Sequence, residues 1–369
     1  MTTPYVPPPY PYDRLDELRA LAADLYGSAI DLSIGAPFDP PTDAVINAFS
    51  TSGAERGYPL SKGSVALREA AARWLDRRFG LTIGVDSIAA CVGTKEFVAG
   101  VPHILRLQRP ERDTVLYPEI SYPTYEFGAV VAGCRAVPVP VDEHWRIDLS
   151  AIDPSDAARA LCLWVNTPGN PAGGLDDLGA AAAWAREHDV PVFSDECYIE
   201  FTWQGEGRSI LEHGDDRVVA VHSLSKRSNL AGARVGFYAG DNDLVRYLSA
   251  VRQHQGHGIP GPAQAAGIVA LDDDAHVDVQ RERYRNRLET MSSVIQSLGV
   301  DCPLPGGGFY LWVPAPDGDA WAFAERLARE LGVIVSPGEF YGPAGSGHIR
   351  IAVVAGDEQF ATVAERCRG

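Results

Sequence analysis

The chain has 369 residues, a hydrophobic fraction of 46% and a formal net charge of -17, so it is long enough for a large domain and a smaller one. The acidic balance argues against nucleic acid as a partner, because a phosphate backbone requires a basic surface. No apolar run approaches the roughly 20 residues needed to cross a bilayer, and the first residues show no export signal, so we expect a cytoplasmic protein without a membrane partner.

The first two thirds of the chain alternate short apolar runs with segments of helical period. The apolar runs cover residues 114–117, 136–139, 161–165, 190–193 and 218–221, and helices are expected at 97–107 and 177–188. Alternation of this kind predicts an α/β fold with a mostly parallel sheet and helices on both faces. Ligands of such sheets bind beyond the carboxyl ends of the strands, where most of the motifs below fall.

A second, smaller unit is expected towards the carboxyl terminus. A long charged helix at 276–298 is followed by a strand at 309–313, a helix at 320–331 and a strand at 348–353. We therefore predict a large domain over residues 46–275 and a small domain over residues 276–369. The six cysteines are scattered without paired spacing, so neither a disulfide framework nor a metal site is expected.

Lysine is rare in this chain, and one lysine stands in a distinctive run. Only three of the 32 basic residues are lysine, and Lys226 is one of them. Arginine does not lose its proton in a protein and cannot condense with an aldehyde, whereas lysine can. Ser223, Ser225 and Arg234 add hydroxyl donors and a fixed positive charge for a phosphate. The run predicts a site for a phosphorylated aldehyde, pyridoxal 5'-phosphate, although taken alone it could be a strand-to-loop exit.

Three other motifs carry chemistry that suits this cofactor. Asp195 follows an apolar run, where an anion keeps a pyridine nitrogen protonated or simply caps a turn. Asn170 lies in a turn rich in proline, glycine and asparagine, which by itself could be an ordinary loop. Gly93, Thr94 and Lys95 precede a helical segment, so their amides are expected either to bind phosphate at a helix amino terminus or to serve as a plain cap.

Taken together, these motifs resemble those of the class I/II aminotransferases, in the fold-type-I family of pyridoxal-phosphate enzymes. The run from Ser223 to Gly236 matches the family spacing without gaps, and the turn from Asn166 to Gly173 matches except that Ala172 replaces the usual threonine. The likeness extends from about residue 32 to residue 354, with the motifs in family order. It implies a fold-type-I transferase in which residues 1–45 form an amino-terminal arm and part of the small domain.

The resemblance implies a role for each matched residue. Lys226 is expected to bond to the cofactor and to move the substrate proton, Asp195 to face the ring nitrogen, and Tyr122 to stack on the ring unless it is a core aromatic. The other cofactor contacts that it implies are Gly93, Thr94, Lys95, Ser223, Ser225 and Arg234 at the phosphate, and Asn170 and Tyr198 at the ring oxygen.

A tyrosine outside these motifs bears on assembly. Tyr58 matches a residue that reaches the phosphate of a neighbouring subunit, which implies a homodimer; the alternative is a surface aromatic in a turn.

Further residues bear on the substrate. Arg350, after a glycine-rich loop, and Gly35 match the residues that hold the substrate α-carboxylate together with Asn170, although a solvated arginine and a turn glycine stay open. The segment 252–258 is expected either to line a substrate pocket, of its own or of a neighbouring subunit, with Arg252 binding a distal carboxylate, or to be a solvated loop.

The resemblance implies that the substrates are amino acids and oxo acids. The overall pattern is most similar to actinobacterial succinyldiaminopimelate aminotransferases, which implies N-succinyl-LL-2,6-diaminopimelate and 2-oxoglutarate, in lysine biosynthesis. An aspartate or other amino-acid aminotransferase remains an alternative, and so does a carbon-sulfur lyase with the same cofactor residues.

Overall fold

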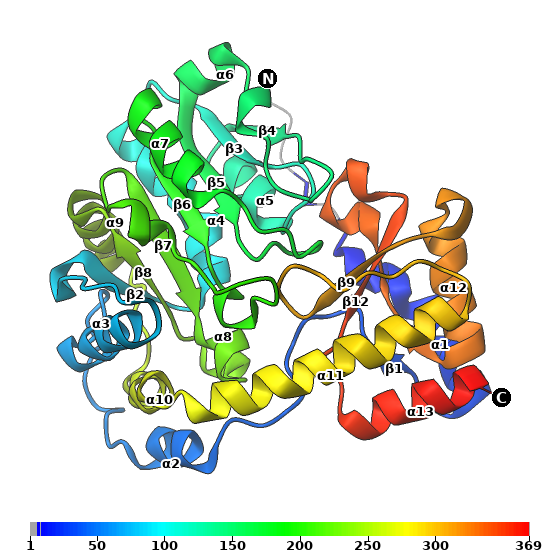
Figure 1. Ribbon diagram of the computed structural model, residues 1–369. Helices are drawn as coiled ribbons and strands as arrows, with labels where there is room; N and C mark the ends of the chain where they lie inside the picture. Colours follow the sequence, from blue (N-terminus) through cyan, green and yellow to red (C-terminus); the bar gives the residue numbers. More distant parts are fainter. Residues whose placement is uncertain (1–5, 8, 369) are drawn as a thin grey trace.

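A seven-stranded sheet forms the core of the larger part of the molecule (Figure 1). The computed structural model describes residues 6–7 and 9–368. The strands, in the spatial order β2-β8-β7-β6-β5-β3-β4, are β2 (Ile88–Cys91), β3 (Thr114–Pro118), β4 (Arg135–Val139), β5 (Ala160–Asn166), β6 (Val192–Asp195), β7 (Val218–Ser223) and β8 (Gly236–Gly240). Only β8 runs antiparallel to its neighbours, so the predicted mostly parallel sheet is confirmed.

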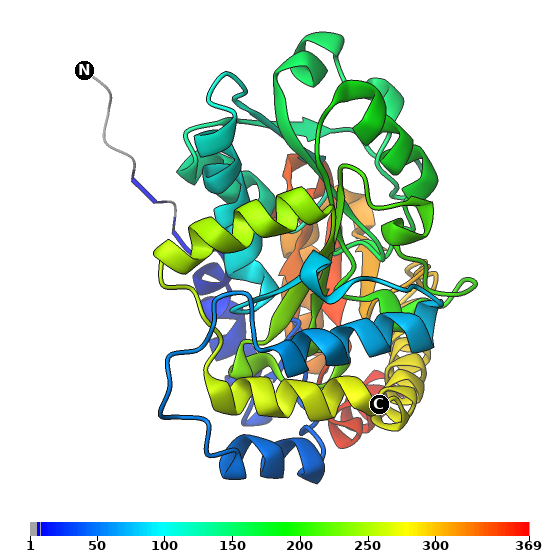
Figure 2. The same ribbon diagram turned by 90° about the vertical axis from the view of Figure 1, so that its left-hand side faces the viewer.

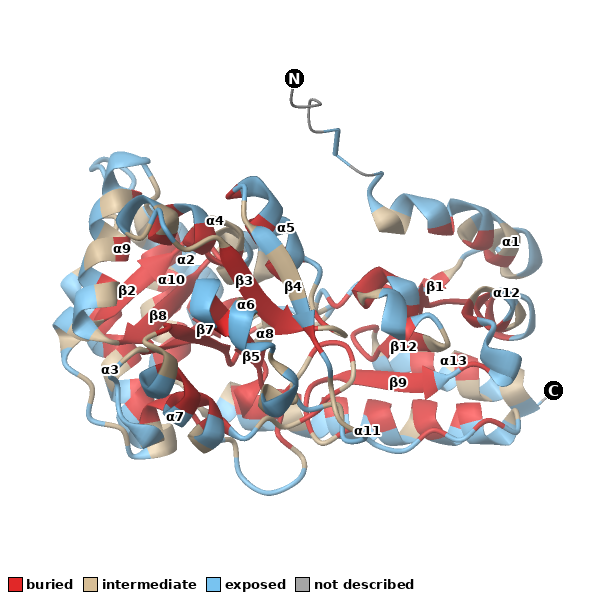
Figure 3. Ribbon diagram, turned by 90° about the horizontal axis from the view of Figure 1, so that it is seen from above, coloured by how far each residue is buried: buried red, intermediate tan, exposed pale blue. Residues whose placement is uncertain are grey.

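Both faces of this sheet are covered by helices, which explains why its strands are almost continuously apolar. Along β7, Val218 and Ala220 pack on one face and Val219 and Val221 on the other, as the two-residue period of a strand requires. The first face is covered by α3 (Val65–Phe79), α7 (Leu178–His188) and α10 (Gly261–Asp272), and the second by α4 (Thr94–Gln108), α5 (Thr124–Val131) and α9 (Asn242–His254). Figure 2 shows the helices lying over the sheet, and Figure 3 shows buried strands between helices whose outer sides are exposed.

The smaller part of the molecule is built on a three-stranded antiparallel sheet. Its strands, in the order β11-β12-β9, are β9 (Tyr310–Pro314), β11 (Ser336–Pro337) and β12 (His348–Ala352). The helices of this part are α11 (Ala275–Ser297), α12 (Ala320–Leu331) and α13 (Asp357–Arg368). Figure 1 shows α11 running from the large sheet to this smaller part. α12 begins after Asp319, whose carboxylate accepts a hydrogen bond from the Ala322 amide.

The amino-terminal segment packs on the smaller part of the molecule. α1 (Asp16–Tyr26) contacts α12, and β1 (Ile30–Asp31) pairs in parallel with β10 (Val333–Ile334). Leu15 and Leu32 belong to the same apolar cluster as Phe309. α2 (Asp43–Thr51) packs against α10 instead. Residues 1–5 and 8 of the expected arm lie outside the described residues, and the boundaries at residues 46 and 276 stay a prediction.

The remaining helices are short connections within the larger part. They are α6 (Pro154–Arg159) and α8 (Leu224–Arg227). Across the described residues, none of the helices combines the length and the apolar character that a membrane span needs.

Candidate active site

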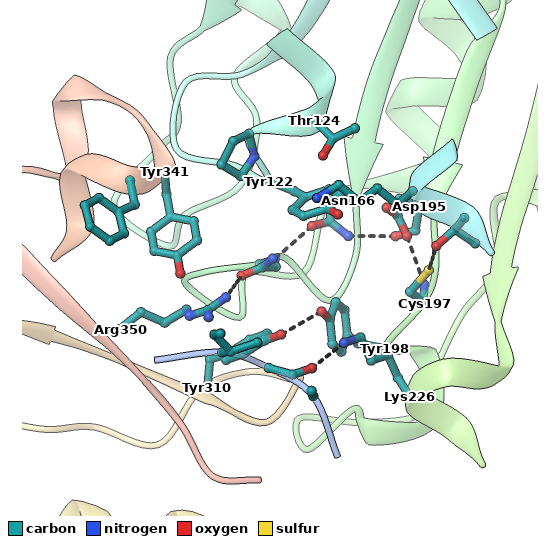
Figure 4. Close-up of a pocket in the computed structure, with 18 of the residues that line it drawn as sticks. Tyr122, Thr124, Asn166, Asp195, Cys197, Tyr198, Lys226, Tyr310, Tyr341 and Arg350 are labelled. Atoms are coloured by element: carbon teal, nitrogen blue, oxygen red, sulfur yellow. Dashed lines mark hydrogen bonds between the residues drawn. The ribbon is translucent and has the colours of Figure 1, made fainter. Parts of the chain in front are cut away.

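A cavity of about 280 Å³ lies where the carboxyl ends of five strands meet, and it is lined from both parts of the molecule (Figure 4). Each of these strands of the large sheet contributes a lining residue at or soon after its end. They are Thr94 after β2, Tyr122 after β3, Asn170 after β5, Asp195 in β6 and Lys226 after β7. The rule that places ligands beyond the strand ends holds here, and the cavity brings these sequence-predicted residues together.

Lys226 lies in α8, directly after β7. Its Nζ donates a hydrogen bond to the backbone oxygen of Gly35, which comes from the amino-terminal segment. Burial lowers the pKa of Lys226 to about 8, from an ordinary value of 10.5. About a tenth of this lysine is therefore neutral at pH 7, far more than of a lysine with the ordinary pKa, and only the neutral amine attacks an aldehyde.

Asp195 ends β6 as a buried carboxylate. Its Oδ2 accepts from the hydroxyl of Tyr125 at 2.9 Å, and its Oδ1 accepts from the amide of Cys197 at 3.2 Å. Burial raises the pKa of Asp195, which these two hydrogen bonds partly oppose. Among the described residues no basic side chain pairs with this carboxylate within 4.0 Å. It is thus an acceptor suited to a protonated ring nitrogen.

The amino terminus of α4 has the features of a phosphate site. Its first turn begins with Thr94, so the leading amides have no acceptor within the helix. Gly93 before it has φ 71°, and a Cβ there would lie 2.2 Å from Nη2 of Arg234. Only glycine lets the guanidinium of Arg234 lie so close to this helix end. Arg234 donates to the oxygen of Ala231 at 3.0 Å and, in the described part of the chain, forms no ion pair.

The two predicted serines lie beside this helix end. Ser223 caps α8, and its Oγ accepts from the amide of Ser225 at 3.2 Å. Ser223 pairs with Gly236 across β7 and β8, and a Cβ on Gly236 would lie 3.2 Å from the methyl carbon of Thr94. The strand register therefore holds Ser223 close to the start of α4, where a phosphate would meet its hydroxyl.

Tyr122 and Lys95 form one wall of the cavity. The Nζ of Lys95 lies 5.9 Å from the centroid of the Tyr122 ring. Tyr122 meets Tyr125 edge to face, with ring centroids 5.9 Å apart. Tyr122 is therefore a cavity residue and not only a core aromatic, as its predicted stacking role requires.

Arg350 reaches the opposite end of the cavity from β12 of the smaller part. Its Nη1 donates to Oδ1 of Asn170 at 2.8 Å, and its Nη2 donates to the oxygen of Ser33 at 2.5 Å. The guanidinium carbon lies 4.2 Å from the ring centroid of Tyr310 and 4.6 Å from that of Tyr341. The buried Nε has no partner, and within the described residues no carboxylate pairs with this charge. An unpaired buried cation of this kind is suited to a substrate carboxylate.

A glycine is required at position 35 because the backbone there lies very close to the side chain of Tyr310. A Cβ on Gly35 would lie 2.1 Å from the hydroxyl oxygen of Tyr310. That hydroxyl shares a 2.8 Å hydrogen bond with the hydroxyl of Tyr198, the tyrosine predicted to contact the cofactor ring oxygen. Tyr125 and Tyr310 are two of the site residues that sequence reasoning missed. Their only signals were position, one in the motif after Tyr122 and the other after the three glycines.

Tyr58 does not join the cavity of its own chain. Its side chain is fully exposed, beside the exposed Leu60, in a surface hollow that includes Pro59 and His257. Its expected contact with a neighbouring subunit's phosphate stays a prediction.

Arg252 corrects a prediction made from the sequence. It lies in the last turn of α9, not in a pocket loop, and it is 1% exposed. Both of its terminal nitrogens donate to the carboxylate of Glu96, at 2.9 and 2.5 Å. It does not line the cavity, and its charge is already paired with Glu96, so within this chain it does not meet the distal carboxylate of a substrate.

The groups around the cavity fit pyridoxal 5'-phosphate. The helix end with Arg234 and Ser223 offers donors and positive charge for the phosphate, Asp195 offers an anion for the ring nitrogen, and Lys226 offers the amine. Among the described residues no cluster of histidine, cysteine and acidic side chains is arranged to bind a metal ion. The fold and the cavity thus define a pyridoxal-phosphate enzyme of fold type I.

Comparison with known proteins gives the family. The model for aminotransferase class I and II matches residues 28–366, and the chain belongs to this family. The predicted family, enzyme class and cofactor are therefore confirmed, and the family acts on amino acids and oxo acids.

Two curated relatives and one solved structure illustrate the similarity. A probable aminotransferase of Mycobacterium tuberculosis is 40% identical over 97% of this chain and 85% of its own length. The 4-dedimethylamino-4-oxo-anhydrotetracycline transaminase of Streptomyces rimosus is 38% identical, over 97% and 98%. The structure of a probable N-succinyldiaminopimelate aminotransferase from Thermus thermophilus is 32% identical, covers 97% of this chain and 99% of its own, and superposes with a TM-score of 0.86.

Proposed function

We propose that this aminotransferase moves the amino group of N-succinyl-LL-2,6-diaminopimelate to 2-oxoglutarate, a step of lysine biosynthesis in the cytoplasm. The observation that carries carboxylate recognition is Arg350, a buried cation in the cavity without an acidic partner among the described residues. The similarity to the Thermus thermophilus protein supports the choice of donor.

Each end of the cavity has its own task in this proposal. Arg350 and Asn170 hold the α-carboxylate, which directs the substrate Cα–H bond towards Lys226. The Nζ of Lys226 takes the α-proton from the amino donor. In the second half-reaction it returns a proton to the α-carbon of the acceptor. Asp195, held by Tyr125, keeps its negative charge beside the ring nitrogen. The bound cofactor supplies an electron sink for the carbanion that forms when the α-proton leaves.

The walls beyond Arg350 suit a substrate with a long distal arm. They are formed by Tyr10, Tyr12, Phe340 and Tyr341. Lys95 adds a second cation to the lining, and its Nζ lies over the Tyr122 ring, 5.9 Å from the centroid. We assign the distal carboxylate to Lys95 in place of Arg252, because Arg252 is already paired with Glu96.

The working unit in this proposal is a homodimer. Tyr58 is fully exposed in its own chain, while the phosphate site around Arg234 keeps an unpaired charge. A second copy would bring its Tyr58 to this site and cover the exposed Leu60. Sedimentation should give a dimer. Tyr58→Phe should weaken cofactor binding without dissociating the dimer.

The substrate proposal is tested by steady-state kinetics with 2-oxoglutarate as acceptor. N-succinyl-LL-2,6-diaminopimelate should give a higher kcat/KM than aspartate or unsubstituted LL-2,6-diaminopimelate. Lys95→Met should reduce this advantage, because the distal carboxylate loses its charge partner. A higher kcat/KM for aspartate would show that aspartate, and not the proposed compound, is the preferred amino donor. Release of ammonia and pyruvate without an oxo-acid acceptor would instead identify a carbon-sulfur lyase.

A ring ketone is a second candidate for the amino acceptor. The observation that favours it is the 38% identity to the Streptomyces rimosus transaminase over nearly the full length of both chains. Such an acceptor lacks a carboxylate on the reacting carbon, so it would leave Arg350 unpaired in that half of the reaction. Turnover of a polycyclic ketone but not of 2-oxoglutarate, with a common amino-acid donor, would favour this candidate.

A further inference from the structure

Arg252 and Glu96 form an ion pair between the end of α9 and the start of α4. Nη1 of Arg252 donates to Oε2 of Glu96 at 2.9 Å, and Nη2 donates to Oε1 at 2.5 Å. The guanidinium carbon also lies 5.4 Å from the centroid of the Phe97 ring, in the same turn of α4. The pair is bidentate and largely buried, so its geometry is well defined.

The carboxylate of Glu96 is turned back towards the chain that enters α4. Its Oε1 accepts from the amide of Val92 at 2.7 Å. Val92 and Gly93 connect β2 to the helix, and the amides of Thr94 and Lys95 follow at once. The ion pair therefore fixes the backbone immediately before the amides that are suited to phosphate.

An acidic residue in this first turn is an electrostatic problem for a phosphate site. The amino end of a helix attracts any anion, so the Glu96 carboxylate and a phosphate compete for the same partial positive charge. Arg252 neutralises Glu96 in place and keeps it on the Val92 amide. Without Arg252, the partly buried carboxylate of Glu96 would keep only the Val92 amide and His257, whose Nδ1 lies 4.0 Å from Oε2, and would stand one turn or less from the phosphate.

We propose that Arg252 is a positioning residue for the cofactor phosphate. It acts through Glu96 and the Val92 amide and does not itself touch the cofactor. This inference rests on the proposed placement of the phosphate at Thr94 and Lys95, with Arg234 beside them.

The test compares two ligands that differ only in the phosphate group. Dissociation constants of the apoenzyme are measured by absorbance titration with pyridoxal 5'-phosphate and with pyridoxal. The wild type should strongly prefer the phosphorylated ligand. Arg252→Met should reduce this preference about tenfold, as expected for charge at a helix end, and leave the affinity for pyridoxal unchanged. Arg246→Met removes an exposed arginine of the same helix and should change neither constant.

A double variant separates charge repulsion from loss of packing. Glu96→Gln combined with Arg252→Met removes the unpaired carboxylate and should recover part of the phosphate preference. Equal weakening of both ligands in Arg252→Met would show a purely structural role and overturn the proposal. If the wild type does not prefer the phosphorylated ligand, the phosphate placement itself is wrong. Should Arg252→Met fail to fold, Arg252→Lys is measured in its place, because it keeps the charge and loses the bidentate geometry. It should give a smaller loss of the phosphate preference, confined to the phosphorylated ligand, and equal weakening of both ligands would contradict the proposal.

Discussion

Arg350 donates from Nη1 to Oδ1 of Asn170 at 2.8 Å, which joins a strand of the smaller part to the loop that follows β5. The two side chains come from positions 180 residues apart and face the same cavity. A carboxylate bound by Arg350 is thereby placed at a fixed point relative to the large sheet and to Lys226.

Arg350→Ala should mainly weaken the binding of carboxylate substrates. Loss of a charged hydrogen bond costs about 1.5–3 kcal/mol, or roughly 10- to 150-fold in kcat/KM. The rise in KM should appear for donor and acceptor alike, because both carry an α-carboxylate. The control is Arg366→Ala, since Arg366 bonds the oxygen of Leu331 away from the cavity. Unchanged KM values in Arg350→Ala would place the carboxylate elsewhere.

Tyr125→Phe should slow the chemical step while the protein stays folded. The lost hydroxyl donates to Asp195 at 2.9 Å, and that hydrogen bond lowers the pKa of the buried carboxyl against the effect of burial. Without it Asp195 is less readily ionised, so kcat should fall about tenfold. The matched control is Tyr238→Phe, whose buried hydroxyl has no hydrogen-bond partner among the described residues. Equal kcat values for the two variants would show that the Tyr125 hydroxyl does not support the ionisation of Asp195.

The reaction of the apoenzyme with pyridoxal 5'-phosphate should depend on the ionisation of Lys226. Burial lowers the pKa of Lys226 to about 8 from 10.5, so about half of the amine is neutral at pH 8 and most of it at pH 9. Stopped-flow rate constants should rise with pH below 8 and become flat above about pH 9. A rate that keeps rising to pH 10 would show a lysine with an ordinary pKa.

The sequence was informative where the physics is local. Continuous apolar runs marked β3, β5, β6 and β7, because strands covered on both faces must be apolar throughout. The run at 136–139 marked β4 as well, although this edge strand is only partly buried. The helix predicted at 320–331 has those bounds in the structure. β2 and β8 were missed because Ile-Ala-Ala-Cys and Gly-Phe-Tyr-Ala-Gly have weak strand propensity, and only their place in the sheet makes them strands.

The site was predictable in its motifs and not in its long-range contacts. The residues after the strand ends could be named because parallel strands bring their carboxyl ends together. The bond from Tyr125 to Asp195 spans 70 positions, and the bond from Tyr198 to Tyr310 spans 112. Arg252 was misplaced because α9 continues through it to His254, which buries its side chain against α4.

The central claim is that Lys226 is the amine that bonds to the cofactor and moves the substrate proton. The most direct test is the visible absorbance of the purified protein with pyridoxal 5'-phosphate, compared between wild type and Lys226→Ala, together with the rate of the half-reaction with amino acid. Lys226→Ala should lose the absorbance of the lysine-bound cofactor and essentially all turnover, while Lys62→Ala, which removes an exposed lysine, should keep both. An unchanged spectrum with retained turnover in Lys226→Ala would contradict this claim.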